Sequence, residues 1–342
     1  MDFIMIQLKL MGDPRDQDRY EALKPNFMKV VQIINFEAFR PVLDKTLGRK
    51  VDPLGRGRRP FDCVLMFKIL ILQHFYTLSD DAMEFMLRDR QSFKEFVGLH
   101  KNALVPDAKT IWLFRQKLVE ASALQPLFDQ TLSQIDAFGF IAQGGQIVDA
   151  TIMESRKPGK QRAPEGVDAL CPAQQRQIDP HATFTKKGDK SYHGYKGHIN
   201  IDNTHKMVRK IHITTASSHD SQAVEALMDL ANTKSEFHGD SAYKSQTMDA
   251  VLDSLAIKNR IVRRAYRNKP LNGHDKRFNK ASSRTRSRVE HVFGQVKLWG
   301  AKIQVRSMGL ARATLGIGLQ FLAYNMNRLR FYVDQKTEAA SF

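Results

Sequence analysis

Three acidic residues stand where an acid is unusual. Asp149 interrupts the strand-like run "QIVDAT", Asp240 follows a glycine in "FHGDSAY", and Glu290 lies in the basic run "SSRTRSRVEHVFGQVKLWG". Strand interiors disfavour Asp unless something compensates its charge. Carboxylates gathered from two strands and one helix form a hard-oxygen site suited to Mg²⁺ or Mn²⁺. Two such ions can activate a water and stabilise the leaving oxygen in phosphodiester cleavage.

Each acid taken alone has a more ordinary interpretation. A single Asp at a strand end is usually a turn or cap residue. An Arg286–Glu290 pair at i,i+4 would be a surface ion pair contributing only about 0.3–0.5 kcal/mol. At about 100° per residue, however, Arg286, Glu290 and Lys297 fall on one stripe of a helix. The neighbouring stripe is apolar and would anchor this helix on a core; it comprises Val289, Phe293 and Val296.

The chain around Glu290 is strongly basic. Residues 258–312 contain sixteen Lys and Arg but only two acids, Asp275 and Glu290. The segment includes a strand-like run and an amphipathic helix, so we interpret it as a folded phosphate-binding surface and not as a disordered tail. The arginines and lysines to which we assign DNA contacts here are Arg286, Lys297, Arg284, Arg288, Arg263 and Arg264.

Composition agrees with a nucleic-acid partner. The 342 residues include 53 Lys and Arg against 36 acids, a formal charge of +17, which favours polyanions through counterion release. Two cysteines without zinc spacing indicate a reducing cytoplasm, and the start of the chain lacks the pattern of a secretion signal. The apolar run 63–72 is about half the ~20 residues that a membrane span needs, so we expect a buried helix and no membrane partner.

The periodicity of the chain changes near residue 138. Residues 15–135 show helical spacing, with Ser79 and Asp107 as predicted N-caps. The remainder alternates β-branched runs with two helical stretches, 220–231 and 245–256, ahead of the helix of Glu290, and residues 154–180 form an irregular excursion. A hairpin turn begins at Asn203. The predicted strands are 146–151, 195–202, 207–215, 237–243 and 257–264.

At this point the sequence resembles a known family. Asp149 in "IVDAT", Asp240 in "HGDSAY" and Glu290 in "RSRVEHVFGQVK" look like the DDE triad of bacterial insertion-sequence transposases, which belong to the retroviral-integrase superfamily. In that group the Glu helix carries Tyr, two residues, Arg, three residues, Glu, six residues and Lys. Arg286, Glu290 and Lys297 match the last three members, while Ser283 stands where the Tyr belongs.

The resemblance implies a fold and a division of the chain. The expected fold is an α/β, ribonuclease-H-like mixed sheet flanked by helices and preceded by an all-α domain. We place the helical domain, a candidate for DNA-end binding and dimerisation, at 1–138. The catalytic domain follows at 139–335 with an irregular basic loop at 154–190, and we expect each domain to bury its own core. Only 49 residues separate Asp240 from Glu290, so the large β insertion of some relatives should be absent.

The resemblance also implies ligands and contacts. Asp149, Asp240 and Glu290 would bind Mg²⁺, for which Mn²⁺ can substitute. Three lysines would lie near the DNA, and Tyr243 near the second aspartate. These lysines are Lys186, Lys187 and Lys196. The alternative for Lys186 and Lys187 is a solvated loop, and the alternative for Lys196 is an exposed position on a strand. Tyr243 could instead be an ordinary core tyrosine.

The implied function is that of a transposase. It would hydrolyse a phosphodiester at the terminal inverted repeats of its element and use the freed 3′-OH to attack target DNA. Its partners would be double-stranded DNA and at least one further copy of itself, in the bacterial cytoplasm. Three alternatives remain: a nuclease of the same fold without strand transfer, a DNA-binding descendant that no longer cleaves, and a basic RNA-binding structural protein.

Overall fold

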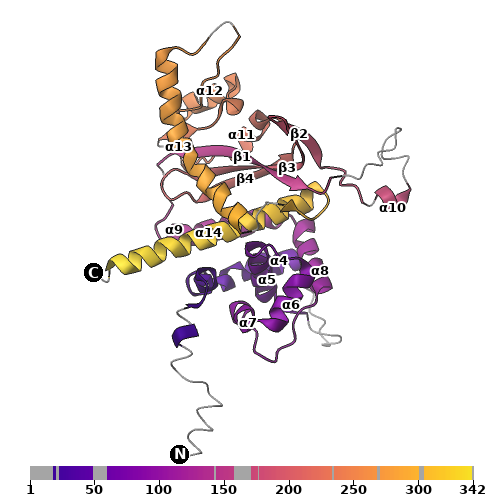
Figure 1. Ribbon diagram of the computed structural model, residues 1–342. Helices are drawn as coiled ribbons and strands as arrows, with labels where there is room; N and C mark the ends of the chain where they lie inside the picture. Colours follow the sequence, from indigo (N-terminus) through magenta and orange to yellow (C-terminus); the bar gives the residue numbers. More distant parts are fainter. Residues whose placement is uncertain are drawn as a thin grey trace, which may run out of the picture.

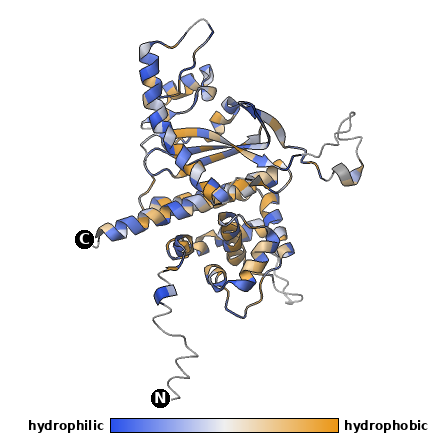
Figure 2. Cartoon of the chain, viewed as in Figure 1, coloured by the Kyte–Doolittle hydropathy of each residue, from blue (hydrophilic) through white to orange (hydrophobic). Residues whose placement is uncertain are grey.

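A computed structural model describes residues 18–20, 23–48, 60–141, 144–157, 171–175, 177–232, 235–267, 270–299 and 304–340. Figure 1 shows the N-terminal helices gathered in one layer, the sheet in another, and the long helix α14 (Leu310–Ala340) crossing between them. The second long helix, α13 (Gly273–Leu298), lies across the sheet and projects beyond it. This projecting end is hydrophilic (Figure 2).

The N-terminal layer is helical, as predicted. Both predicted N-caps are confirmed, since Ser79 accepts a hydrogen bond from the Ala82 amide and Asp107 accepts one from that of Thr110. The run 63–72 forms the buried helix that was expected, apart from a few half-buried side chains. The elements are η1 (Asn26–Lys29), α3 (Val30–Ile33), η2 (Phe36–Phe39), α4 (Arg40–Leu47), α5 (Cys63–Phe75), α6 (Asp80–Asp89), α7 (Gln91–Val97), α8 (Ala108–Glu120) and α9 (Leu124–Ala137).

The sheet is mixed, with strand order β2-β3-β1-β5-β6. In addition, β4 pairs with β3, and β7 pairs with β1. The long central strand β1 pairs antiparallel with β3 and parallel with β5, as Ile147 beside His238 shows. The strands are β1 (Gln146–Ser155), β2 (Thr183–Lys187), β3 (Lys190–Asp202), β4 (Val208–Thr215), β5 (Glu236–His238), β6 (Lys258–Asn259) and β7 (Gln304–Val305).

Several predicted strand limits were wrong. Strand 237–243 stops at His238, because Asp240 accepts a hydrogen bond from the Ala242 amide and caps the short helix η5 (Ser241–Tyr243). Strand 257–264 shortens to β6, where the Asn259 side chain accepts from the Ile261 amide and turns the chain. The expected loop at 154–190 contains the last two residues of β1, the short helix α10 (Pro172–Gln175), β2 and the first residue of β3. Its residues 158–170 and 176 lie outside the described residues.

The predicted helix 220–231 is also shorter than expected. It consists of η4 (Asp220–Ala223) and α11 (Val224–Leu227), after which Met228 is extended. The Gln146 side chain of β1 donates hydrogen bonds to the carbonyls of Asp229 and Asn232, and this draws the chain onto the sheet. Helix α12 (Gln246–Ser254) agrees with its prediction within two residues at each end.

The two faces of the sheet are covered differently. Val148 packs with residues of α11 and α12, whereas Ile147 and Met153 belong to the large buried cluster that includes α13 and α14. The buried members of that cluster come from both parts of the chain, from Phe27 in the helical layer to Leu329 of α14. We expected separate cores, but α14 packs on α5 and on β4, so the helical layer and the sheet share one. The boundary at residue 138 stays a prediction.

Candidate active site

Asp149 lies near the middle of β1, opposite Ile199 of β3. Side chains alternate along a strand, so Asp149 shares its face with Ile147 and points toward α13. Its Oδ1 accepts a hydrogen bond from the Ala150 amide at 2.9 Å, and its Oδ2 lies 3.6 Å from Nη1 of Arg286. Burial raises the pKa of this carboxyl to about 6, because Arg286 compensates only part of the desolvation.

Asp240 is brought beside Asp149 by the parallel pairing of β1 and β5. The last paired residues are Ile147 and His238, and each acid lies two residues beyond its own member of that pair. The Asp240 carboxylate is oriented by the hydrogen bond that it accepts from the Ala242 amide at 2.7 Å. Its negative charge is one of the causes that raise the pKa of Asp149. The structure therefore places two of the three predicted acids together.

Glu290 lies on α13, one helical turn after Arg286 and about 6 Å further along the helix axis. Its side chain is exposed and has no hydrogen bond or ion pair with the described residues. The described part of the chain gathers no set of three acids, histidines or cysteines close enough to hold a metal ion. Arg286 pairs with Asp149, so the Arg286–Glu290 surface pair, the ordinary interpretation, does not form.

The other predicted DNA-binding residues of this region differ in their surroundings. Lys297, Arg284 and Arg264 are exposed, and none has a carboxylate partner among the described residues. Arg288 donates to the Asn203 carbonyl at 2.6 Å. Arg263 is bound within the protein, since it pairs with Asp275 and lies 4.3 Å from the ring centre of Phe278.

The hairpin of β2 and β3 carries the remaining predicted lysines. Lys186 and Lys187 are exposed on β2, where a loop was expected, and the positive charge of Lys187 lowers the pKa of Asp149. Lys196 is already engaged: its ammonium donates to Asp220 at 2.9 Å and to the Ser218 carbonyl at 2.7 Å.

Tyr243 is fully buried, as in the core-tyrosine alternative, and yet it lies near the acids. Burial raises the pKa of its hydroxyl, and the charges of Asp220, Asp149 and Asp240 raise it further. Sequence reasoning missed Asp220, the partner of Lys196. In the sequence, Asp220 is only the first residue of the predicted helix 220–231, a position that indicates a helix start and not a lysine partner.

Comparison with known families decides the identity of this arrangement. Residues 142–326, more than half of the 342, match a family model described as a transposase DDE domain. The chain belongs to the DDE transposase family. Residues 18–117 of this transposase match a second model, a transposase domain (DUF772). No solved structure matches.

Family membership confirms the resemblance to insertion-sequence transposases, and the mixed sheet behind a helical region confirms the fold class. It also makes DNA the partner of this transposase. Assignment to the group with the Tyr-Arg-Glu-Lys signature stays a prediction. None of the described helices is both long and apolar enough to span a membrane.

DDE transposases generally use a divalent metal, and the two aspartates fit one. Both are oxygen donors, as Mg²⁺ and Mn²⁺ prefer. The Asp149 carboxylate is largely removed from water, next to a second acid, and its nearest cation is 3.6 Å away. Such a pair has uncompensated negative charge, which a divalent cation would neutralise.

Proposed function

We propose that this transposase cleaves phosphodiester bonds at the terminal inverted repeats of its insertion sequence and joins the freed 3′ ends to target DNA. The observation that carries the proposal is the placement of Asp149 beside Asp240, on the face of β1 that meets α13. Two carboxylates lie at this position, under a helix that carries exposed cations and a glutamate with no partner among the described residues. This arrangement fits phosphodiester chemistry better than it fits structural stabilisation.

Asp149 and Asp240 would hold Mg²⁺, or Mn²⁺ in its place, with Glu290 as the third ligand. A bound divalent metal would supply activation of the attacking oxygen and stabilisation of the leaving oxygen. Glu290 is free to turn toward the aspartates because no described residue holds its side chain. Arg286 would orient the Asp149 carboxylate and contact the phosphate beside it.

The exposed cations of α13 would bind the DNA backbone. Among the described residues, Lys297 and Arg284 have no carboxylate to release before they contact phosphate, whereas Lys196 and Arg263 would have to give up an ion pair. We therefore assign backbone contacts to Lys297, Arg284 and the exposed lysines of β2, whereas Arg286 would contact the phosphate beside Asp149 without leaving its ion pair. Since two transposon ends must be joined to one target, the active form would contain at least two copies of the chain.

The test is cleavage and gel-shift titration on one labelled transposon end. Asp149→Asn, Asp240→Asn and Glu290→Gln should each abolish Mg²⁺-dependent cleavage while the variants still bind the end. Asp253→Asn makes the same charge change on the exposed surface of α12 and should cleave normally. Undiminished cleavage in EDTA, or by Glu290→Gln, would contradict the proposed ligand set.

A second assay separates the alternatives. A precleaved end with a free 3′-OH should join a second duplex if the protein is a transposase in the full sense. A nuclease without strand transfer would cleave the intact end but leave the precleaved one unjoined. A DNA-binding descendant would bind both substrates and convert neither.

A further inference from the structure

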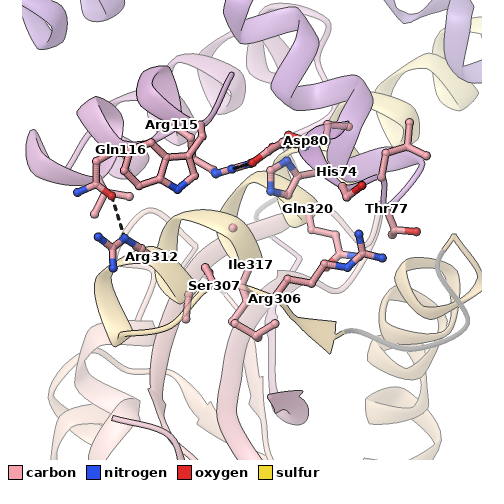
Figure 3. Close-up of a pocket in the computed structure, with 18 of the residues that line it drawn as sticks. His74, Thr77, Asp80, Arg115, Gln116, Arg306, Ser307, Arg312, Ile317 and Gln320 are labelled. Carbon is pink, nitrogen blue, oxygen red and sulfur yellow. Dashed lines mark hydrogen bonds and ion pairs between the residues drawn. The ribbon is translucent and has the colours of Figure 1, made fainter. Parts of the chain in front are cut away.

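A pocket of about 400 Å³ lies between the helical layer and the start of α14. Its walls come from the end of α5, the start of α6, α8, and the segment from β7 into α14 (Figure 3). It is separate from the candidate active site. Val305 of β7 pairs with Ser155, and six residues of strand, about 20 Å, separate Ser155 from Asp149.

The pocket carries positive charge that the protein does not neutralise. Arg306 is exposed, and it has no hydrogen bond or ion pair with the described residues. Arg312 donates to the Gln116 side chain at 2.8 Å and has no carboxylate partner among those residues either. Two acids, Asp80 and Asp81, also line the pocket, but Asp80 is already paired with Arg115 at 2.5 Å. Arg115, Arg306 and Arg312 outnumber the two acids of the described lining by one, and guanidinium groups without a carboxylate partner among the described residues, as in Arg306 and Arg312, favour an anionic ligand such as phosphate.

The opposite wall is polar, and its Asp80 is paired with Arg115. Figure 3 shows His74, Thr77 and Asp80 on the side of the helical layer, facing Arg306 and Arg312 on the other. His74 Nδ1 lies 2.7 Å from the Leu70 carbonyl, which can only accept, so Nδ1 carries the proton and Nε2 is an acceptor. Burial lowers the pKa of His74 to about 4, which keeps the ring neutral. Together with the carboxamide of Gln320, which faces the pocket from α14, these side chains offer both donors and acceptors.

An exposed aromatic side chain also lines the pocket. Trp112 lines the pocket from α8 and keeps 44% of its surface exposed, although large aromatic residues are usually buried. An exposed aromatic face beside cationic groups is the arrangement on which unpaired bases stack while the backbone is held by charge.

The cationic wall is held in place. The Gly309 amide, between the two arginines, donates to Asp179 at 3.1 Å, and the same carboxylate accepts the Tyr195 hydroxyl of β3 at 2.8 Å. Asp179 is buried, so these bonds are shielded from water. A ligand in this pocket would therefore contact a wall fixed to the sheet and a wall built from the helical layer.

We propose that this pocket binds one nucleotide of an unpaired DNA strand, with its two flanking phosphates on Arg306 and Arg312 and its base between Trp112 and the polar wall. The strand would belong to the DNA on which the proposed function acts, so the inference rests on that function for the identity of the DNA. The chemistry of the pocket itself requires only a phosphate joined to a planar, hydrogen-bonding ring.

The experiment uses Trp112 as its own reporter. The chain has two tryptophans, and Trp299→Phe preserves the aromatic contact with Phe75 while leaving Trp112 as the single tryptophan fluorophore. In this background, with Asp149→Asn and EDTA present to prevent cleavage, a short single-stranded oligonucleotide should quench Trp112 saturably. Binding is measured without catalysis, so a failure of the proposed cleavage activity does not affect the result.

Variants identify the contacts. Arg306→Ala should weaken the quenching isotherm by roughly ten- to a hundredfold, the effect of losing one charged hydrogen bond. Lys117→Ala removes the same charge from α8 outside the pocket and should change affinity less than about threefold. In wild-type background, Trp112→Ala should weaken single-strand binding about tenfold or more, whereas Leu113→Ala, at an equally exposed neighbour outside the pocket, should not.

Three outcomes would overturn the proposal. The first is an absence of quenching, or quenching unaffected by Arg306→Ala. The second is equal quenching by blunt duplex DNA, which would mean that the pocket takes backbone alone. The third is a mononucleotide that binds as tightly as the oligonucleotide, since the ligand would then be a free nucleotide and not a strand.

Discussion

Replacing Asp149 by Asn should stabilise the metal-free protein, although it removes a proposed catalytic group. The carboxylate is 20% exposed, its nearest cation is 3.6 Å away, and Asp240 lies beside it. Its pKa rises from the usual 3.8 to about 6 on folding, which corresponds to about 3 kcal/mol at 1.36 kcal/mol per unit. An uncharged Asn of the same shape avoids this cost.

The raised pKa of Asp149 makes the stability of the wild-type protein depend on pH. Because the folded protein holds the Asp149 proton more tightly than the unfolded chain does, the free energy of unfolding falls as pH rises from about 4 to about 6. The full penalty is present above that range. The amide introduced by Asp149→Asn does not titrate, so the variant and the wild type should differ by about 2–3 kcal/mol at pH 7.5 and by much less near pH 4.

The assay is urea unfolding of both proteins in EDTA at the two pH values. Asp220→Asn is the matched control, because its carboxylate is 21% exposed but lies 2.9 Å from Lys196. Asp220→Asn leaves the Lys196 ammonium without its carboxylate, so this variant should be less stable than the wild type at pH 7.5 by about 1–3 kcal/mol. The effect is opposite in sign to that expected for Asp149→Asn. If Asp149→Asn were as destabilising as Asp220→Asn, Asp149 would be a structural residue and our account of its uncompensated charge would be wrong.

Three further predictions concern α14, the sheet and DNA. Asn325→Ala should lower the free energy of unfolding by about 2–4 kcal/mol in urea titrations, because it leaves the Val208 amide and carbonyl unpaired. Gly194→Ala should unfold or severely destabilise the protein by circular dichroism, since Gly194 has φ +151° and a Cβ would lie 2.1 Å from the Met153 carbonyl oxygen. DNA affinity should fall with salt with a log–log slope of about −0.9 per phosphate contacted by the 258–312 segment, and a flat response would contradict a phosphate-binding role.

Elements set by neighbouring residues were predictable from the sequence. The caps at Ser79 and Asp107 act on amides three residues away, and both formed as expected. Ile147 and Val148 favour a strand by their own shape, and β1 formed around Asp149. The limits of β5 and β6 were missed because Asp240 and Asn259 end those strands by bonding their own following amides, and a sequence pattern of alternating residues does not show this.

The candidate site was predictable by residue type and only partly by geometry. The spacing of Arg286, Glu290 and Lys297 placed them on one helical face, but it did not show that Arg286 reaches Asp149, which is 137 positions earlier. Lys196 was assigned to DNA through the family resemblance, whereas Asp220 binds its ammonium. Contacts of this kind depend on how helices and strands pack, and a single sequence contains no direct record of that packing.

The shared core has a consequence for how the acid helix is held. Trp299 is the C-cap of α13, and its ring centre lies 4.2 Å from that of Phe75 of α5. The Thr77 hydroxyl donates a hydrogen bond to the Trp299 carbonyl at 3.5 Å. Thr77 also lines the pocket between the helical layer and α14. The helix that carries Glu290 therefore ends on the same turn that forms one wall of that pocket. Since packed elements shift as units and not atom by atom, the helical layer contributes to positioning Glu290.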